Sequence, residues 1–116
     1  MPIGARPVDI AHLSRYTGGD ADLNAEVLML FTNQSVDILN RLDEALKNGD
    51  GKMWRQLAHS IKGGARGIGA FSLAETAEAA EPVDVVEETA QARRALDDLK
   101  LRNEAVRRFV DAYLKR

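Results

Sequence analysis

The stretch from His59 to Ser72, HSIKGGARGIGAFS, holds the residues with the clearest chemical potential in the chain. The spacing of Gly63, Gly67 and Gly69 is typical of a glycine-rich loop whose backbone N–H groups hold a dinucleotide pyrophosphate. The start of the stretch indicates a different chemistry, because the imidazole of His59 can act as a nucleophile beside the cation of Lys62. The elements around the stretch decide between these two interpretations.

Apolar residues recur at intervals of three and four along nearly the whole chain, which predicts amphipathic helices rather than strands. A short first helix is expected over 8–16, with Asp9 as its cap. A long second helix follows, capped by Asp20 or Asp22 and ended by Asn48-Gly49. Its predicted buried stripe consists of Leu23, Val27, Leu30, Phe31, Ile38, Leu42, Ala45 and Leu46.

The third predicted helix begins near Asp50 or Gly51 and carries His59 on its polar face. Its buried stripe is formed by Trp54, Leu57, Ile61, Ala65 and Ile68. At about 100° per residue, Ile61 lies about 200° around the helix from His59, so the imidazole should point to solvent. The residues at the i-4, i+3, i+4 and i+7 positions beside it are Arg55, Lys62, Gly63 and Arg66.

Two further helices are predicted from capping patterns in the last third of the chain. Ser72 and Glu75 form a capping-box pattern for a short fourth helix that Pro82 ends. Asp84 and Glu87 repeat the pattern before a last helix, which we treat as one element, bent or straight near 101–103.

Four amphipathic helices with short links bury their apolar stripes as a bundle in which neighbours run antiparallel. The predicted fold is therefore all-α, an up-down antiparallel four-helix bundle with a short N-terminal capping helix. The length of 116 residues fits a single domain over 1–116.

Composition narrows the function classes. With 16 basic and 18 acidic residues, the net charge of -2 gives no basic field for nucleic acid or an anionic membrane. The absence of cysteine excludes disulfides and thiolate metal sites, and we expect a cytoplasmic protein. No apolar run reaches the length of about 18 residues that a membrane helix needs.

The predicted helices argue against the dinucleotide loop. Such a loop follows a strand and opens a helix, whereas the residues before Gly63 have helical periodicity. The tyrosine and lysine pair of short-chain dehydrogenases is also missing, since Asp20 stands four residues after Tyr16. We therefore expect no nucleotide cofactor.

The histidine interpretation explains the glycines better. A helical glycine costs about 1 kcal/mol relative to alanine, and Gly63, one turn beyond His59, would leave the imidazole open to a bulky incoming group. Lys62, and secondarily Arg66, would stabilise the negative charge of a phosphoryl group during transfer. The same cations disfavour a charged ring, which leaves a nitrogen lone pair for attack.

The segment 59–70 resembles the H-x-x-K-G-small-small-x-x-hydrophobic-G-A signature of histidine-containing phosphotransfer (HPt) domains, and the predicted bundle is similar to the fold of that family. The resemblance implies that His59 accepts and donates a phosphoryl group on Nε2, with Lys62 contacting the phosphate and Gly63 giving access. It also implies a polar side chain from the next helix on the other ring nitrogen. Glu81, then Glu78, are the candidates, at a position where glutamine is common.

By this resemblance the protein is a stand-alone phosphorelay intermediate between aspartates of receiver domains. Its expected partners are the receiver domains of response regulators and hybrid histidine kinases, which would supply the carboxylate and Mg²⁺. We expect no metal site, no cofactor and no autonomous kinase activity in this chain, and a monomeric state. The expected docking face contains Arg55, Ala58, Lys62, Gly63 and Arg66, with Leu28 and Leu39 from the preceding helix.

Two alternatives stay open at this point. One is a phosphoacceptor module that docks to a kinase active site, as in chemotaxis-type kinases. The other is a non-enzymatic helical adaptor or dimerisation bundle in which His59 has no chemical role.

Overall fold

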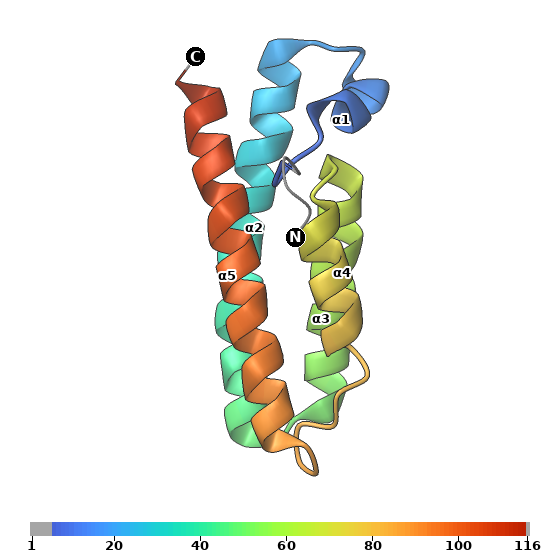
Figure 1. Cartoon of the computed structure of the whole chain (residues 1–116), viewed down its shortest axis with the longest axis vertical. Coiled ribbons are helices and arrows are strands. Elements are labelled where there is room, and N and C mark those ends of the chain that lie inside the picture. The colour runs from blue at the N-terminus through green and yellow to red at the C-terminus, as the bar shows by residue number, and fades with distance from the viewer. Residues whose placement is uncertain (1–5, 116) are drawn as a thin grey trace.

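The computed structural model describes residues 6–115, which form helices and no strand. The helices are α1 (Ile10–Thr17), α2 (Ala21–Asn48), α3 (Gly51–Ile68), α4 (Phe71–Ala80) and α5 (Thr89–Leu114). Helices α2 to α5 run alternately up and down, and α2 and α4 each pack against both α3 and α5 (Figure 1). Helix α1 lies across one end and contacts α2 and α3. The predicted all-α bundle with an N-terminal capping helix is confirmed.

Aspartate N-caps and glycine C-caps set the ends of the first three helices. The carboxylates of Asp9, Asp20 and Asp50 each accept hydrogen bonds from backbone N–H groups in the first turn, so Asp20 rather than Asp22 caps α2. The three helices end at left-handed glycines, which are Gly18, Gly49 and Gly69. None of the helices in residues 6–115 is long and apolar enough to cross a membrane.

The capping box predicted at Ser72 and Glu75 is wrong. The backbone N–H of Ala70 donates to the carbonyl of Ala65 and closes α3, while the carbonyl of Ala70 already accepts from Ala74. Helix α4 therefore starts at Phe71, and its N-cap, Ala70, makes no side-chain cap hydrogen bond. Because the closing turn of α3 leads directly into α4, Ser72 falls inside the first turn.

The prediction that Asp84 and Glu87 start the last helix is also wrong, because the N-cap of α5 is Glu88. The carboxylate of Asp84 accepts from the N–H groups of Val86 and Glu87, which forms a turn before α5. Helix α5 begins five residues later than Asp84, at Thr89, and then continues without interruption to Leu114. The treatment of the last helix as one element is confirmed.

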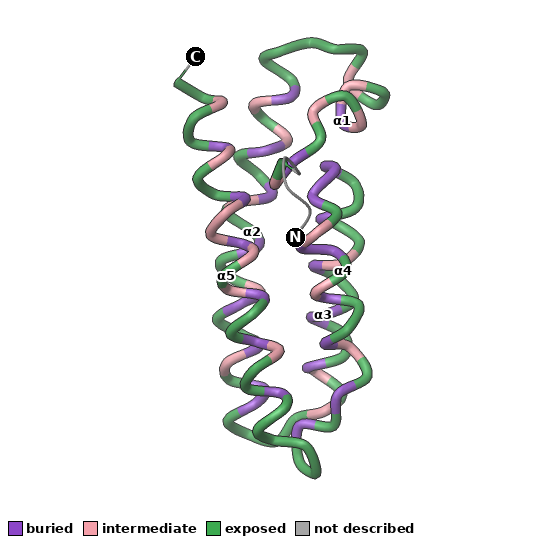
Figure 2. Tube along the Cα trace, in the orientation of Figure 1, coloured by how far each residue is buried: buried purple, intermediate pink, exposed green. Residues whose placement is uncertain are grey.

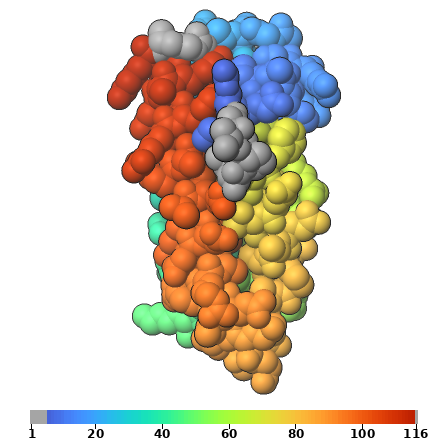
Figure 3. Space-filling model, in the orientation of Figure 1, coloured from blue at the N-terminus to red at the C-terminus, as the bar shows by residue number. Residues whose placement is uncertain are grey.

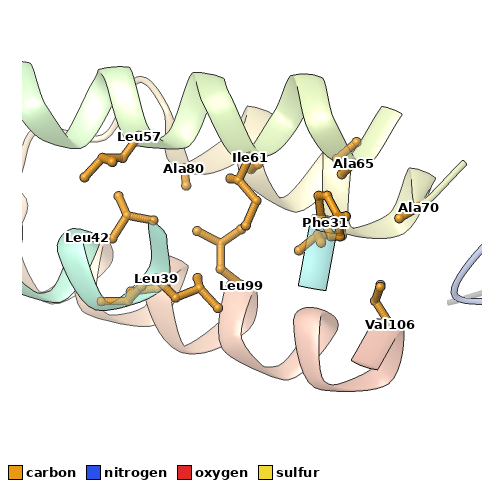
Figure 4. Packing of buried hydrophobic residues seen from close by; sticks show 14 of the residues in the cluster. Phe31, Leu39, Leu42, Leu57, Ile61, Ala65, Ala70, Ala80, Leu99 and Val106 are labelled. Atoms are coloured by element: carbon orange, nitrogen blue, oxygen red, sulfur yellow. The ribbon is translucent and has the colours of Figure 1, made fainter. Parts of the chain in front are cut away.

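A single cluster of apolar side chains fills the space between α2, α3, α4 and α5 (Figure 4). Buried positions recur along each of these helices (Figure 2). Leu28 and Leu39, which we expected on the docking face, are buried in this cluster, and Figure 4 shows Leu39 among the core side chains. By contrast, Leu23 and Leu30 of the predicted stripe are 41% and 58% exposed. The prediction was wrong because α2 packs against two neighbours, so its buried face is centred between α3 and α5.

Helix α1 is fixed at both of its ends. The backbone N–H of Asp9 donates to the carbonyl of Gly69 over 2.9 Å, at the corner between α3 and α4. At the other end, the hydroxyl of Thr17 hydrogen-bonds to the buried side chain of Asn24, whose amide also reaches the hydroxyl of Tyr113 at 3.3 Å. Figure 3 shows α1 at the upper end of the bundle, above α4 and level with the last turns of α5.

Among the glycines of residues 6–115, Gly69 is the one that both the backbone and the packing require. Its φ is 82°, and an added Cβ would lie 2.6 Å from the carbonyl oxygen of Asp9. Gly67 lies two residues earlier within α3, and an added Cβ there would have no heavy atom within 4 Å. The two positions therefore respond differently to the same substitution.

We expect Gly69→Ala to lower the free energy of unfolding by about 2 kcal/mol or more, because a left-handed backbone and a steric contact act together. We expect Gly67→Ala to raise it by up to about 1 kcal/mol, since alanine favours a helix interior. Chemical denaturation of both variants measures the difference. Equal stabilities for the two variants would contradict the role assigned to Gly69.

Candidate functional site

His59 lies near the middle of α3 and points away from the core. Its side chain is 72% exposed, while Ile61 and Ala65 on the opposite face are fully buried. The outward orientation expected from the helical spacing is confirmed. An exposed imidazole is accessible to another protein without any movement of the core.

Glu81 is the side chain that holds the ring. Its Oε1 lies 2.9 Å from Nδ1 of His59, and it stands at the C-cap of α4, directly before Pro82. The end of α4 is placed by the buried Trp54 of α3, whose indole N–H donates to the carbonyl of Ala80 over 2.8 Å. Of the two glutamates considered, Glu81 contacts the imidazole.

The contact determines which ring nitrogen is free. The hydrogen bond with His59, followed by the charge of Lys62, holds the pKa of the Glu81 carboxyl below its ordinary value, so this group is ionised near neutral pH. An ionised carboxylate only accepts hydrogen bonds, so Nδ1 must carry the proton. In the neutral ring, Nε2 then has the lone pair.

Lys62 and Arg66 are both paired with carboxylates of α4 or its C-cap. Nζ of Lys62 lies 3.5 Å from Oε1 of Glu81, and the Lys62 side chain is only 14% exposed. The guanidinium of Arg66 donates to Glu78 over 2.8 Å, at a more exposed position. Two ion pairs between α3 and α4 therefore flank the imidazole on the same side.

The glycines beside His59 differ in what they contribute. An added Cβ at Gly63 would have no heavy atom within 4 Å, so this position is open beside the ring. An added Cβ at Gly64 would lie 3.2 Å from the ring of Phe31. Gly63 therefore leaves space next to His59, whereas Gly64 allows Phe31 of α2 to approach α3 closely.

Comparison with known proteins agrees with the function that this geometry indicates. The sequence matches the Hpt domain family over residues 26–110, which is most of the chain. The chain belongs to the Hpt domain family. No curated protein sequence matches it.

Among solved structures, this Hpt domain is similar to the crystal structure of histidine-containing phosphotransfer protein B (HptB) from Pseudomonas aeruginosa PAO1. The TM-score is 0.85 at 25% sequence identity, and the match covers 97% of this chain and 99% of the other. Histidine phosphotransfer in a phosphorelay is thus the function of this chain, and Hpt proteins interact with receiver domains of their phosphorelay partners. The adaptor alternative has no comparable support.

The surface of the Hpt domain near His59 contains a groove that sequence reasoning missed. It has a volume of about 390 Å³ and continues along α3 from Gly64 to Gly67. Its walls come from the end of α1 and one side of α2, and include Leu13, Tyr16, Leu23, Val27, Leu30 and Phe31. The signal was present in the sequence, because Leu23, Val27 and Leu30 share one face of α2, but that face was assigned to the core.

The expected docking residues fall into two groups. Arg55, Gly63 and Arg66 are exposed on α3 around His59. Ala58 is fully buried, and α3 packs against α4. Ala58 therefore cannot contact a partner protein without a change in the fold. With Leu28 and Leu39 also buried, the exposed apolar surface is the groove instead.

The role of Glu81 can be measured in the free Hpt domain. We expect the neutral ring of His59 to carry its proton on Nδ1, and Glu81→Gln to keep this tautomer because the amide oxygen still accepts the hydrogen bond. Glu81→Leu should increase the tautomer protonated on Nε2, since Nδ1 loses its acceptor. Long-range proton and nitrogen correlation spectra of the imidazole distinguish the two forms.

Glu78→Leu is the matched control, because Glu78 bonds to Arg66 and not to the ring. A tautomer ratio that is the same in the original protein and in Glu81→Leu would show that the contact does not orient the imidazole.

Proposed function

We propose that His59 is the phosphoacceptor of this Hpt domain. Its Nε2 takes the phosphoryl group from the aspartyl phosphate of one receiver domain and later passes it to the aspartate of another. The observation that carries this proposal is the exposed ring whose Nδ1 is engaged by the Glu81 carboxylate at 2.9 Å, since this leaves Nε2 as the nucleophile facing solvent.

The receiver domain supplies the rest of the reaction centre in this proposal. Its phosphorylated aspartate is the donor, and Mg²⁺ held by the receiver neutralises the charge on the phosphoryl oxygens. The Hpt domain contributes the nucleophile, its orientation and nearby cations, and takes no cofactor of its own. Lys62 is the first cation for the phosphoryl group and Arg66 the second, which requires each to turn from its present carboxylate.

We place the receiver domain on the face shared by α2 and α3. The apolar groove begins next to Gly63, one turn from His59, and Tyr16 and Leu30 at its rim are 71% and 58% exposed. An exposed apolar patch of this kind is typical of a protein interaction site. Arg55 and Arg66 provide the positive rim that would face an acidic receiver active site.

The partners are response regulators and hybrid histidine kinases that carry such receiver domains. The expected compartment is the cytoplasm, and the expected state of the free protein is a monomer. Neither nucleic acid nor a membrane is an expected partner, given the net charge of -2.

Replacement of His59 by glutamine tests the assignment directly. We expect His59→Gln to keep the helical circular dichroism spectrum and to take up no label from a phosphorylated receiver domain, because the amide is not a nucleophile. The original protein should take up label that is lost in acid and kept in base.

The second histidine provides the matched control for this experiment. His12 packs against the rings of Tyr16 and Phe71, so His12→Gln should retain uptake. Persistent labelling of His59→Gln would refute the assignment. Label that arrives only from a kinase with ATP, and never from a receiver domain, would favour the kinase-docking alternative.

Gly63→Ala separates access from stability. The added methyl group has open space in the free protein, so the free energy of unfolding should rise by about 0.5 to 1 kcal/mol. The rate of phosphoryl uptake should nevertheless fall by about tenfold or more, because the methyl group keeps the incoming phosphoryl group from the position in which Nε2 can attack it. Stopped-flow or quenched-flow labelling measures the rate.

Gly67→Ala is the reference variant, since it adds the same methyl group to the groove of the proposed docking face, but two turns from His59. It should stabilise the protein equally and slow uptake less. Equal rates for Gly63→Ala and the original protein would contradict the access role of Gly63.

A further inference from the structure

The imidazole ring of His59 gains a positive charge when it is phosphorylated. When Nε2 attacks the aspartyl phosphate, the N–P bond forms, the P–O bond to the aspartate breaks, and the aspartate leaves as a carboxylate. Nδ1 keeps its proton throughout because it donates to Glu81. The neutral ring thereby becomes a positively charged phosphoimidazolium, bonded to a phosphoryl group with two negative charges.

In the free protein, one carboxylate oxygen serves two donors. Oε1 of Glu81 lies 2.9 Å from Nδ1 of His59 and 3.5 Å from Nζ of Lys62. Before phosphorylation the ring is uncharged in the attacking form, so the ionic partner of Glu81 is Lys62. The Lys62 side chain is largely covered, which keeps its ammonium close to this oxygen.

We propose that Lys62 and Glu81 exchange ionic partners when His59 is phosphorylated. Glu81 becomes the counter-ion of the positively charged ring, and the ammonium of Lys62 moves from Glu81 to the phosphoryl oxygens. Before the exchange there is one pair of opposite charges, Lys62 with Glu81. After it there are two, Glu81 with the ring and Lys62 with the phosphoryl group, and no proton has to be released. This inference rests on the proposed role of His59 and assigns a charge function to Glu81 beyond its role as a hydrogen-bond acceptor.

The exchange has a consequence for onward transfer. A phosphoimidazolium loses its phosphoryl group with a neutral imidazole as leaving group, whereas loss from the deprotonated ring would require an imidazolate. A carboxylate on Nδ1 keeps the proton in place, which an amide at the same position does less well. Glu81 thus acts as a positioning residue that holds the phosphorylated ring in its reactive form.

The other charged groups facing the ring do not replace this pair. Glu78 is engaged by Arg66 over 2.8 Å, and it makes no hydrogen bond to His59. Arg55 and Arg66 are cations, so they oppose the positive charge of the ring instead of neutralising it. Among the charged side chains around His59, Glu81 is the one that can act as counter-ion.

Glu81→Gln separates charge from hydrogen bonding, because the side chains have the same shape and both accept from Nδ1. The protein is phosphorylated with phosphoramidate, and the ³¹P resonance of the phosphohistidine is followed as the pH is raised. We expect the midpoint for loss of the Nδ1 proton to lie about one pH unit lower in Glu81→Gln, a tenfold weaker hold on the proton, because a negative charge at hydrogen-bond distance favours the charged form of the ring and the amide has no such charge.

Glu78→Gln is the matched control for this titration. It removes the same charge from the same helix three residues earlier, so its midpoint should remain close to that of the original protein. Equal midpoints in Glu81→Gln and the original protein, or equal shifts in Glu81→Gln and Glu78→Gln, would overturn the assignment of Glu81 as counter-ion.

The Lys62 half of the exchange has its own measurement. At a fixed ratio of phosphoramidate to ammonium ion, Lys62→Met should lower the ratio of phosphorylated to free protein by about tenfold, since the phosphoryl group loses its closest cation. Arg66→Met is the control and should have a smaller effect. An unchanged ratio in Lys62→Met would overturn this half. Labelling that survives in His59→Gln would instead refute the proposed phosphoacceptor, so the two failures are distinguishable.

Discussion

The hydrogen bond between His59 and Glu81 is the interaction on which the site depends. It joins a side chain in the middle of one helix to a side chain at the end of the next, and it is formed only if α3 and α4 keep their relative register. A carboxylate can accept from Nδ1 but cannot donate to it, so a single contact selects both the orientation and the tautomer of the ring. The chemistry of Nε2 follows from the occupation of Nδ1.

The bundle maintains this register through contacts that are far more buried than the site itself. Trp54 is fully covered, and its hydrogen bond to the carbonyl of Ala80 places the last residue of α4 one position before Glu81. At the opposite end, Gly69 turns α3 directly into α4. A buried tryptophan and a left-handed glycine thus fix the two ends of the α3 and α4 pair, and the exposed imidazole requires no strained geometry.

Much of this arrangement could be predicted from the sequence because it depends on local periodicity. The spacing of Trp54, Leu57 and Ile61 defines one face of α3, and His59 must then lie on the other. The aspartate caps and the glycine ends are similarly local. The choice between Glu78 and Glu81 was not local, because it depends on how far α4 is shifted along α3, and no spacing within either helix contains that distance.

The incorrect predictions concern features that depend on a neighbouring helix, which the periodicity of a single helix does not describe. Leu28 and Leu39 were assigned to the surface because one stripe was drawn for one neighbour, whereas α2 has two neighbours and a wider buried face. The Ser72 cap failed because the closing turn of α3 already supplied the start of α4. The groove was missed for the same reason. The buried face of α2 contains Leu28 instead of Leu23 and Leu30, so these two side chains are exposed and line the groove.

The attachment of α1 allows the shape of the groove to change independently of the environment of the His59 imidazole. Because Asp9 is held at Gly69 and Thr17 at Asn24, α1 is a fixed wall of the groove rather than a movable flap. Tyr16 projects from this wall without touching the residues that orient His59. Substitutions there can alter the shape offered to another protein while the imidazole keeps its environment, so duplicated copies of such a gene can diverge in the signalling circuit they serve and still perform the same transfer.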